Sequence, residues 1–141
     1  MTDTDSRLAA LKGPLCYPMG LVYVVAGVAH FLVPMLFERI VPPQLPRPRE
    51  LVYLSGIAEI VLGVGVWFRR TRRPSAWGLI ALLLAVFPAN VYMAVGEPGA
   101  GRLPTAVDDI PDAALWARLP LQAVLILWAW WYTQPATDET E

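Results

Sequence analysis

Long apolar segments alternate with short polar ones along this chain. Four segments are almost entirely apolar: residues 15–37, 51–68, 75–95 and 114–132. About 20 mostly apolar residues in a helix cover the roughly 30 Å hydrocarbon core of a bilayer, so each segment is long enough to span it. The pattern predicts an all-α fold, namely a polytopic transmembrane four-helix bundle with up-down-up-down topology.

Composition supports a membrane protein and leaves little room for a separate soluble domain. The 141 residues are 56% hydrophobic and 16% charged, which is more apolar and less charged than a typical soluble domain. We expect an N-terminal tail (1–14), a membrane domain (15–132) and an acidic C-terminal tail (133–141). The first segment is too long for the apolar core of a signal peptide. The single cysteine, Cys16, excludes an internal disulfide and a dithiol motif.

Basic residues predict the orientation. The link between the second and third segments contains four arginines in five residues, Arg69, Arg70, Arg72 and Arg73. Short arginine-rich loops stay in the cytoplasm, so this link and both termini are predicted to be cytoplasmic. Five of the six tryptophans then fall at the inner ends of the segments, where indoles favour the interface. The lipid bilayer is the expected partner, and no nucleic acid is expected.

Five polar side chains lie within the apolar segments. They are His30, Glu59, Asn90, Arg118 and Gln122. At about 1.5 Å per residue they fall roughly 14–22 Å from the inner end of each segment, between the middle of the membrane and its outer boundary. Such groups are costly in lipid and face the interior of a bundle. The sequence therefore predicts one outward-facing polar pocket.

Helical spacing adds neighbours to this pocket. Gly20, Tyr23, Gly27, His30 and Pro34 follow steps of three and four residues, which places them on one helical face. Ser55, Gly56, Glu59 and Gly63 form a similar face on the second segment. Small residues there allow two helices to approach closely. Tyr23, Ser55 and Pro34 are therefore added as candidate ligand-binding residues. Pro34 is expected to kink the helix and to free the carbonyl group of His30.

Each polar residue also has a purely structural interpretation. Asn90 and Gln122 serve either as ligand-binding groups or as hydrogen bonds that hold helices together, and Arg118 either lines the pocket or reaches the outer interface. An ionisable pair is an expensive way to join helices, so Glu59 and His30 are predicted to form a catalytic, proton-exchanging pair. No metal site is predicted, because one histidine and one glutamate make a poor ligand set.

The order and spacing of these motifs resemble a known family. The segment GVAHFLVPMLF (27–37), followed by IVPPQLP and LVYLSGIAEIVLG and later by VFPANVYMA and LPLQ…WAWWY, resembles the DoxX-like family of small membrane proteins. The resemblance covers about residues 20–132. It implies a four-helix bundle in the cytoplasmic membrane of a prokaryote and a link to redox chemistry, since the related DoxD is a subunit of a thiosulfate:quinone oxidoreductase. Thiol chemistry known in similar folds is not expected, because Cys16 stands alone.

Together these observations predict a redox-associated subunit that binds a quinone or another small molecule in the polar pocket. No intrinsic cofactor is expected, and any enzymatic role would be as a subunit of a quinone-linked oxidoreductase. Two alternatives remain open: a non-catalytic assembly or stability factor that docks a partner helix, and a small-solute transporter, for which four helices would need to oligomerise.

Overall fold

A computed structural model of the chain describes residues 2–95 and 112–134. In that part of the chain all regular structure is helical, so the all-α prediction is confirmed there. The helices are α1 (Asp3–Leu32), α2 (Pro34–Glu38), α3 (Pro48–Gly65), α4 (Arg69–Val95) and α6 (Asp112–Thr133). Two of the described helices, α1 and α4, are long and apolar enough to cross a membrane.

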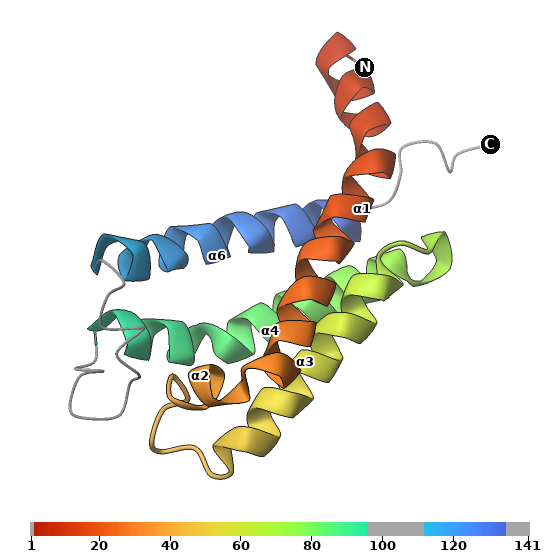
Figure 1. The fold of residues 1–141 in the computed structure, drawn as a ribbon. Coiled ribbons are helices and arrows are strands. Elements are labelled where there is room, and N and C mark those ends of the chain that lie inside the picture. Colours follow the sequence, from red (N-terminus) through yellow and green to blue (C-terminus); the bar gives the residue numbers. More distant parts are fainter. Residues whose placement is uncertain (1, 96–111, 135–141) are drawn as a thin grey trace.

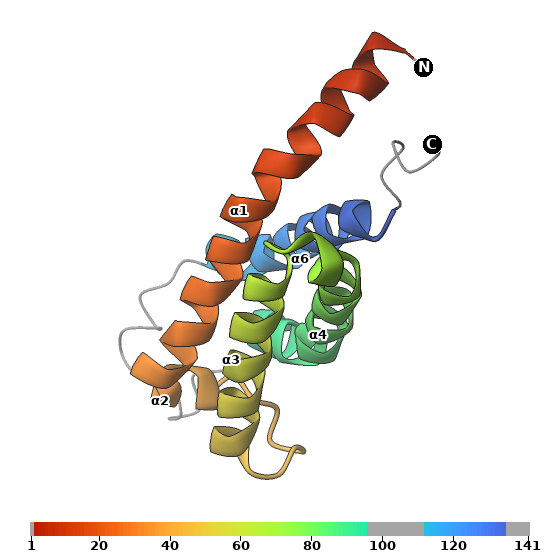
Figure 2. The same ribbon diagram turned by 90° about the vertical axis from the view of Figure 1, so that its right-hand side faces the viewer.

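The four long helices form two packed pairs. α1 packs along α3, and α4 packs along α6, while a tight turn joins α3 to α4. The pairs meet near this turn and diverge toward the end of the molecule where α2 lies (Figure 1). A second view shows α1 and α3 side by side, with α4 and α6 seen nearly along their axes (Figure 2). This divergence sets the two pairs apart at one end of the fold.

Glycines bring α1 and α3 into backbone contact. A Cβ atom on Gly27 would lie 2.6 Å from the carbonyl oxygen of Gly56, and one on Gly63 would lie 2.8 Å from that of Gly20. Real Cβ atoms do not approach an oxygen this closely, so any side chain at these positions would push the helices apart. The two glycine pairs fix both the separation of the helices and their antiparallel register.

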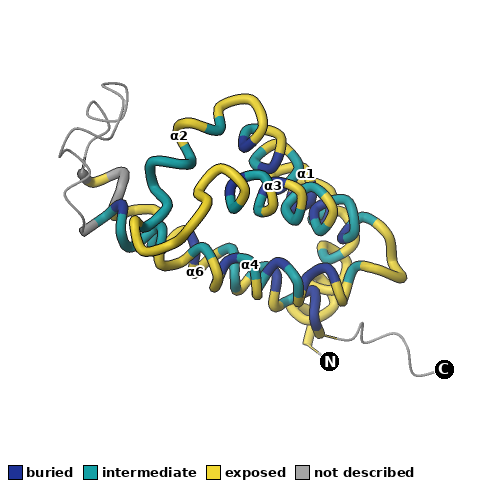
Figure 3. The backbone as a smooth tube through the Cα atoms, turned by 90° about the horizontal axis from the view of Figure 1, so that it is seen from below, coloured by how far each residue is buried: buried dark blue, intermediate teal, exposed yellow. Residues whose placement is uncertain are grey.

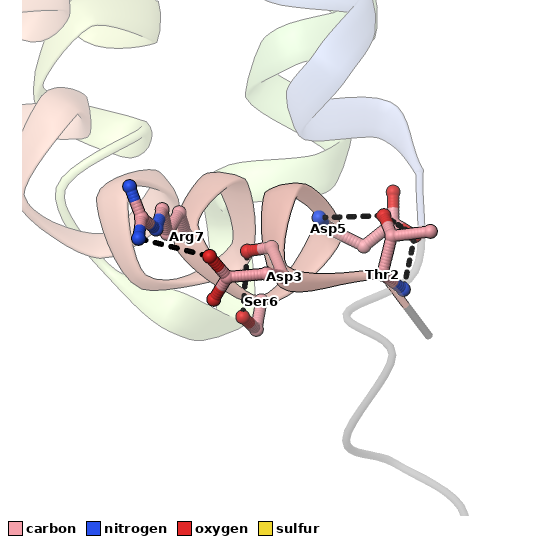
Figure 4. A network of polar contacts seen from close by, with 5 residues as sticks. All are labelled: Thr2, Asp3, Asp5, Ser6 and Arg7. Atoms are coloured by element: carbon pink, nitrogen blue, oxygen red, sulfur yellow. Dashed lines mark hydrogen bonds and ion pairs between the residues drawn. The ribbon is translucent and has the colours of Figure 1, made fainter.

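α1 begins earlier than the sequence predicts. Thr2 is its N-cap: the Thr2 hydroxyl accepts a hydrogen bond from the Asp5 backbone N–H, and an Asp5 carboxylate oxygen accepts one from the Thr2 N–H at 3.0 Å (Figure 4). Hydrogen bonds from the Thr2 side chain and backbone lower the pKa of Asp5. Arg7 pairs with Asp3 one turn earlier. Residues 3–14, predicted to be a tail, are therefore helical and continuous with α1.

Pro34 ends a helix instead of bending one. α1 stops at Leu32, the N–H of Val33 donates to the carbonyl oxygen of Ala29, and Pro34 is the first residue of α2. The missing N–H costs nothing at that position, because the first residues of a helix have no intrahelical acceptor. The prediction of one helix through residues 15–37, kinked at Pro34, is wrong for this reason.

The predicted arginine-rich link is also helical. The chain turns at residues 66–68, and α4 already begins at Arg69. The side chains of Thr71 and Arg72 make this turn short, because they cap α3: the Thr71 hydroxyl donates to the carbonyl oxygen of Gly65 at 2.7 Å, and Arg72 Nε donates to that of Val66 at 2.8 Å. Both bonds satisfy carbonyl groups that the end of a helix leaves without partners.

The main apolar core lies where the pairs meet. It includes Cys16 and Met19 of α1, Leu79 of α4 and Tyr132 of α6, all almost fully buried. The Tyr132 hydroxyl donates to the carbonyl oxygen of Lys12 at 2.8 Å, which ties α6 to α1. Exposed residues follow the outer sides of the helices (Figure 3). The closed end of the molecule is therefore held by ordinary core packing.

The glycine contact gives a direct stability prediction. Gly27→Ala should lower the free energy of unfolding by about 1–3 kcal/mol, because the new methyl group overlaps the α3 backbone. Gly13→Ala is the matched control, since nothing lies within 4 Å of a Cβ atom there. Thermal unfolding in detergent compares the two, and equal melting temperatures would contradict the close contact.

Candidate functional site: a polar cavity between the helix pairs

A cavity of about 590 Å³ lies between the α1–α3 pair and the α4–α6 pair. Its walls are mainly aliphatic, with a few polar side chains among them. The polar residues that line it are Tyr23, His30, Ser55, Glu59, Asn90, Arg118 and Gln122. The structure thus brings to one cavity seven of the eight residues that the sequence selects as site candidates. Pro34 is the exception and is not part of the lining.

His30 is held in place by contacts on α1 and α2. Its Nδ1 lies 2.8 Å from the carbonyl oxygen of Ala26, one turn earlier, and the ring of Phe37 stacks on the imidazole with centroids 3.9 Å apart. A carbonyl oxygen can only accept, so Nδ1 carries the hydrogen. In the neutral ring Nε2 is then an acceptor. The Phe37 ring and the Ala26 carbonyl together fix both the orientation and the tautomer of His30.

Glu59 lies next to His30 but is not hydrogen-bonded to it. Oε2 of Glu59 is 3.3 Å from Nδ1 of His30, although that N–H points at the Ala26 carbonyl oxygen. Within the described residues, Glu59 Oε2 and the hydroxyl group of Tyr23 are buried and have no hydrogen-bond partner. Buried polar atoms are nearly always paired, because an unpaired one forfeits its hydration. This wall of the cavity therefore offers unused hydrogen-bonding capacity.

On the opposite wall, the amides of Asn90 and Gln122 already have hydrogen-bond partners within the protein. The Gln122 side chain is almost fully buried and uses both ends of its amide: Oε1 accepts from Asn90 Nδ2, and Nε2 donates to the carbonyl oxygen of Leu83, each at 2.5 Å. Pro88 has no backbone N–H, so the carbonyl group of Leu84, the residue after Leu83, lacks its usual donor within the helix. Of the two interpretations of Gln122, the structure favours the structural one, a clamp between α4 and α6.

Arg118 contributes the positive charge on this side. Its Nη1 lies 3.1 Å from the sulfur of Met93 on α4, and its side chain borders the cavity while the residue as a whole stays exposed. A thioether is a weak acceptor, so the guanidinium keeps most of its donors free. Arg118 therefore lies at the rim, between the cavity and the outside.

The segment between α1 and α3 covers the open end of the cavity. Phe37, Ile40, Val41 and Leu45 contribute apolar lining. An ion pair between Glu38 and Arg49 Nε, at 2.5 Å, holds α2 against the start of α3. Arg47 has a left-handed backbone with φ of 53° immediately before Pro48, a conformation that is costly for a residue with a side chain. The strained position turns the chain back into α3.

Sequence reasoning missed the groups that orient the candidates. Phe37 was assigned to the first transmembrane helix, although its spacing of seven residues from His30 signals a shared face. A sequence does not show which backbone carbonyl groups accept side-chain hydrogen bonds, so the contacts to the carbonyl groups of Ala26 and Leu83 could not be predicted. Among residues 2–95 and 112–134, no three metal-ligating side chains gather in one place.

The Gln122 clamp can be tested by substitution. Gln122→Leu should lower the free energy of unfolding by about 1–3 kcal/mol, since it removes the acceptor of the Asn90 amide and one hydrogen bond to the Leu83 carbonyl group. Gln44→Leu makes the same change at an exposed position and serves as the control. Unfolding midpoints in detergent measure both, and no difference between them would show that the clamp contributes nothing.

Comparisons with known proteins identify a family without a function. A family model described as a domain of unknown function (DUF8561) matches residues 19–133, and the chain belongs to that family. The match begins within α1 and ends with α6, so it includes every residue that lines the cavity. Neither the curated proteins nor the solved structures contain a match.

Proposed function

We propose that this member of the DUF8561 family is a multi-pass membrane protein that binds a quinone or a similar small amphiphile in the cavity between its helix pairs. One observation carries the proposal: two residues with unpaired, buried polar atoms, Tyr23 and Glu59, line a cavity whose walls are otherwise mainly apolar. Ligand sites combine a largely apolar lining with a few polar groups that fix orientation. The resemblance to the DoxX-like family adds the link to quinones and redox complexes.

The outer faces of the helices support a membrane location. Large apolar side chains are exposed on all four long helices, and they include Leu21, Val25, Ile57, Val61, Leu84, Phe87, Val124 and Leu127. A helix that is apolar on its outer face as well as on its packed face is typical of a bilayer span. Two helices, α1 and α4, meet the length and composition needed to span a bilayer. α3 and α6 carry four of the polar residues of the cavity, Ser55, Glu59, Arg118 and Gln122, and we propose that these helices cross as well.

Charges suggest how the protein is oriented. The arginines at the start of α4 lie at the closed end of the fold, where Arg72 Nη2 contacts the sulfur of Cys16 at 3.3 Å. Lys12 and Gln134 meet at the same end, so the first part of α1 and the end of α6 lie on one side. Positively charged ends stay in the cytoplasm. We propose that both termini are cytoplasmic, in the plasma membrane of a prokaryote, and that the cavity opens toward the outer side.

The contacts of the polar residues support different roles. His30 and Glu59 are close enough to exchange a proton: once Nε2 of His30 takes a proton from a ligand hydroxyl group, the Nδ1 proton can pass from the imidazolium to the carboxylate of Glu59. Tyr23 and Ser55 line the same wall and can bind the head group of a ligand. Arg118 can attract an electron-rich carbonyl group at the rim. We propose that the protein acts within a larger redox complex, as the resemblance to the DoxX-like family implies.

Filling the cavity tests the proposal. Ala58 lines the cavity on α3, so Ala58→Phe should occupy the space of the ligand and weaken binding of decylubiquinone at least about tenfold. The purified protein is reconstituted in lipid nanodiscs, and binding is followed by quenching of its tryptophan fluorescence. Ala81→Phe adds the same bulk at an exposed position of α4 and should bind normally.

Two results would contradict this function. Equal affinity of both variants would mean that the quinone binds elsewhere. No binding by the native protein, together with a stoichiometric helical partner recovered by crosslinking in membranes, would favour an assembly factor instead.

A further inference from the structure

The two cavity-lining residues that carry unpaired buried atoms, Tyr23 and Glu59, lie at one level of the α1–α3 contact. Tyr23 lies between Gly20 and Gly27 on α1, and Glu59 lies between Gly56 and Gly63 on α3. Because Gly20 meets Gly63 and Gly27 meets Gly56, the two residues lie opposite each other, between the glycine contacts. Both line the cavity, and only 4% of Tyr23 is exposed.

Tyr23 and Glu59 differ in the hydrogen bonds that their side chains can make. An ionised carboxylate can only accept, whereas a tyrosine hydroxyl can both donate and accept. A ligand hydroxyl group satisfies both residues through one oxygen, since it donates to Oε2 of Glu59 and accepts from Tyr23. A ligand carbonyl group accepts from Tyr23 but leaves the carboxylate unpaired, and an unpaired buried charge is costly.

The opposite wall cannot reverse this selection. The amides of Asn90 and Gln122 are bonded to each other and to the Leu83 carbonyl group, so both ends of the Gln122 amide already have a partner within the protein. His30 directs its N–H at Ala26. Arg118 lies at the rim, so beside the α1–α3 contact the selection between a hydroxyl and a carbonyl group falls to Tyr23 and Glu59.

We propose that the cavity selects the reduced, hydroxyl-bearing form of its ligand, a quinol or other phenol, over the corresponding quinone. This inference rests on the proposed function, that the cavity takes a quinone-type head group. The phenolic O–H donates to Oε2 of Glu59 and its oxygen accepts from the Tyr23 hydroxyl. The aliphatic lining, which includes Val22, Leu82 and Leu125, surrounds the ring and the start of its tail.

The test compares decylubiquinol with decylubiquinone under anaerobic conditions. The full chain is reconstituted in nanodiscs, in mildly alkaline buffer that keeps the carboxylate ionised, and both affinities are measured. The native protein should bind the quinol at least about tenfold more tightly, because one hydrogen bond to a charged group is made only by the quinol. Glu59→Gln should abolish this preference, since an amide can donate to a carbonyl as well as accept from a hydroxyl.

Two matched controls separate this effect from general damage. Glu50→Gln and Tyr17→Phe make the same chemical changes at exposed positions of α3 and α1, and both should keep the preference for the quinol. Tyr23→Phe should weaken quinol binding while leaving the melting temperature close to that of the native protein, because its hydroxyl has no partner to lose.

The outcomes distinguish the two proposals. Equal affinity of the native protein for both forms, or a preference that survives Glu59→Gln, overturns the selection of the quinol and leaves the proposed function intact. Binding of neither form by the native protein overturns the proposed function itself.

Discussion

The backbone contact between α1 and α3 is the constraint on which the rest of the structure depends. Gly20 and Gly27 meet Gly63 and Gly56 with no space for a Cβ atom, so these two helices are closer than side chains would allow. The contact brings His30 and Tyr23 beside Glu59 and places all three on one wall. A wider separation would lengthen the 3.3 Å approach of His30 Nδ1 to Glu59 Oε2.

The two walls of the cavity use polar groups in opposite ways. On the α4–α6 side, Gln122 is paired at both ends of its amide, so the polar groups stabilise the helix pair. On the α1–α3 side, Tyr23 and Glu59 keep unpaired atoms. A buried polar atom without a hydrogen-bond partner lowers the stability of the protein, and such an atom is typical of a site where a ligand supplies the missing hydrogen bond. The α4–α6 side therefore holds the cavity in shape, and the α1–α3 side offers the polar groups that can bind a ligand.

Much of the site follows from helical periodicity. Steps of three and four residues place Gly20, Tyr23, Gly27 and His30 on one face, and the structure buries all four. Depths between the middle of the membrane and its outer boundary group Glu59, Asn90, Arg118 and Gln122 in the sequence, and the structure places all four around one cavity. The positions where the helices end could not be predicted in the same way. Pro34 permits either a kink or a new helix, and the α3–α4 turn depends on Thr71 and Arg72 capping carbonyl groups six residues earlier. Such bonds between side chains and the backbone leave no periodic pattern in the sequence.

The central claim is that a ligand head group lies against the wall formed by α1 and α3. Photoaffinity labelling tests it most directly, with a quinol that carries a diazirine next to its ring, added to the protein in native membranes and mapped by mass spectrometry. The account predicts labels on cavity-lining positions such as Tyr23, Ala26 and Ser55, and competition by unmodified quinol. Labels confined to lipid-facing residues such as Val25 and Val61, unaffected by competitor, would contradict it.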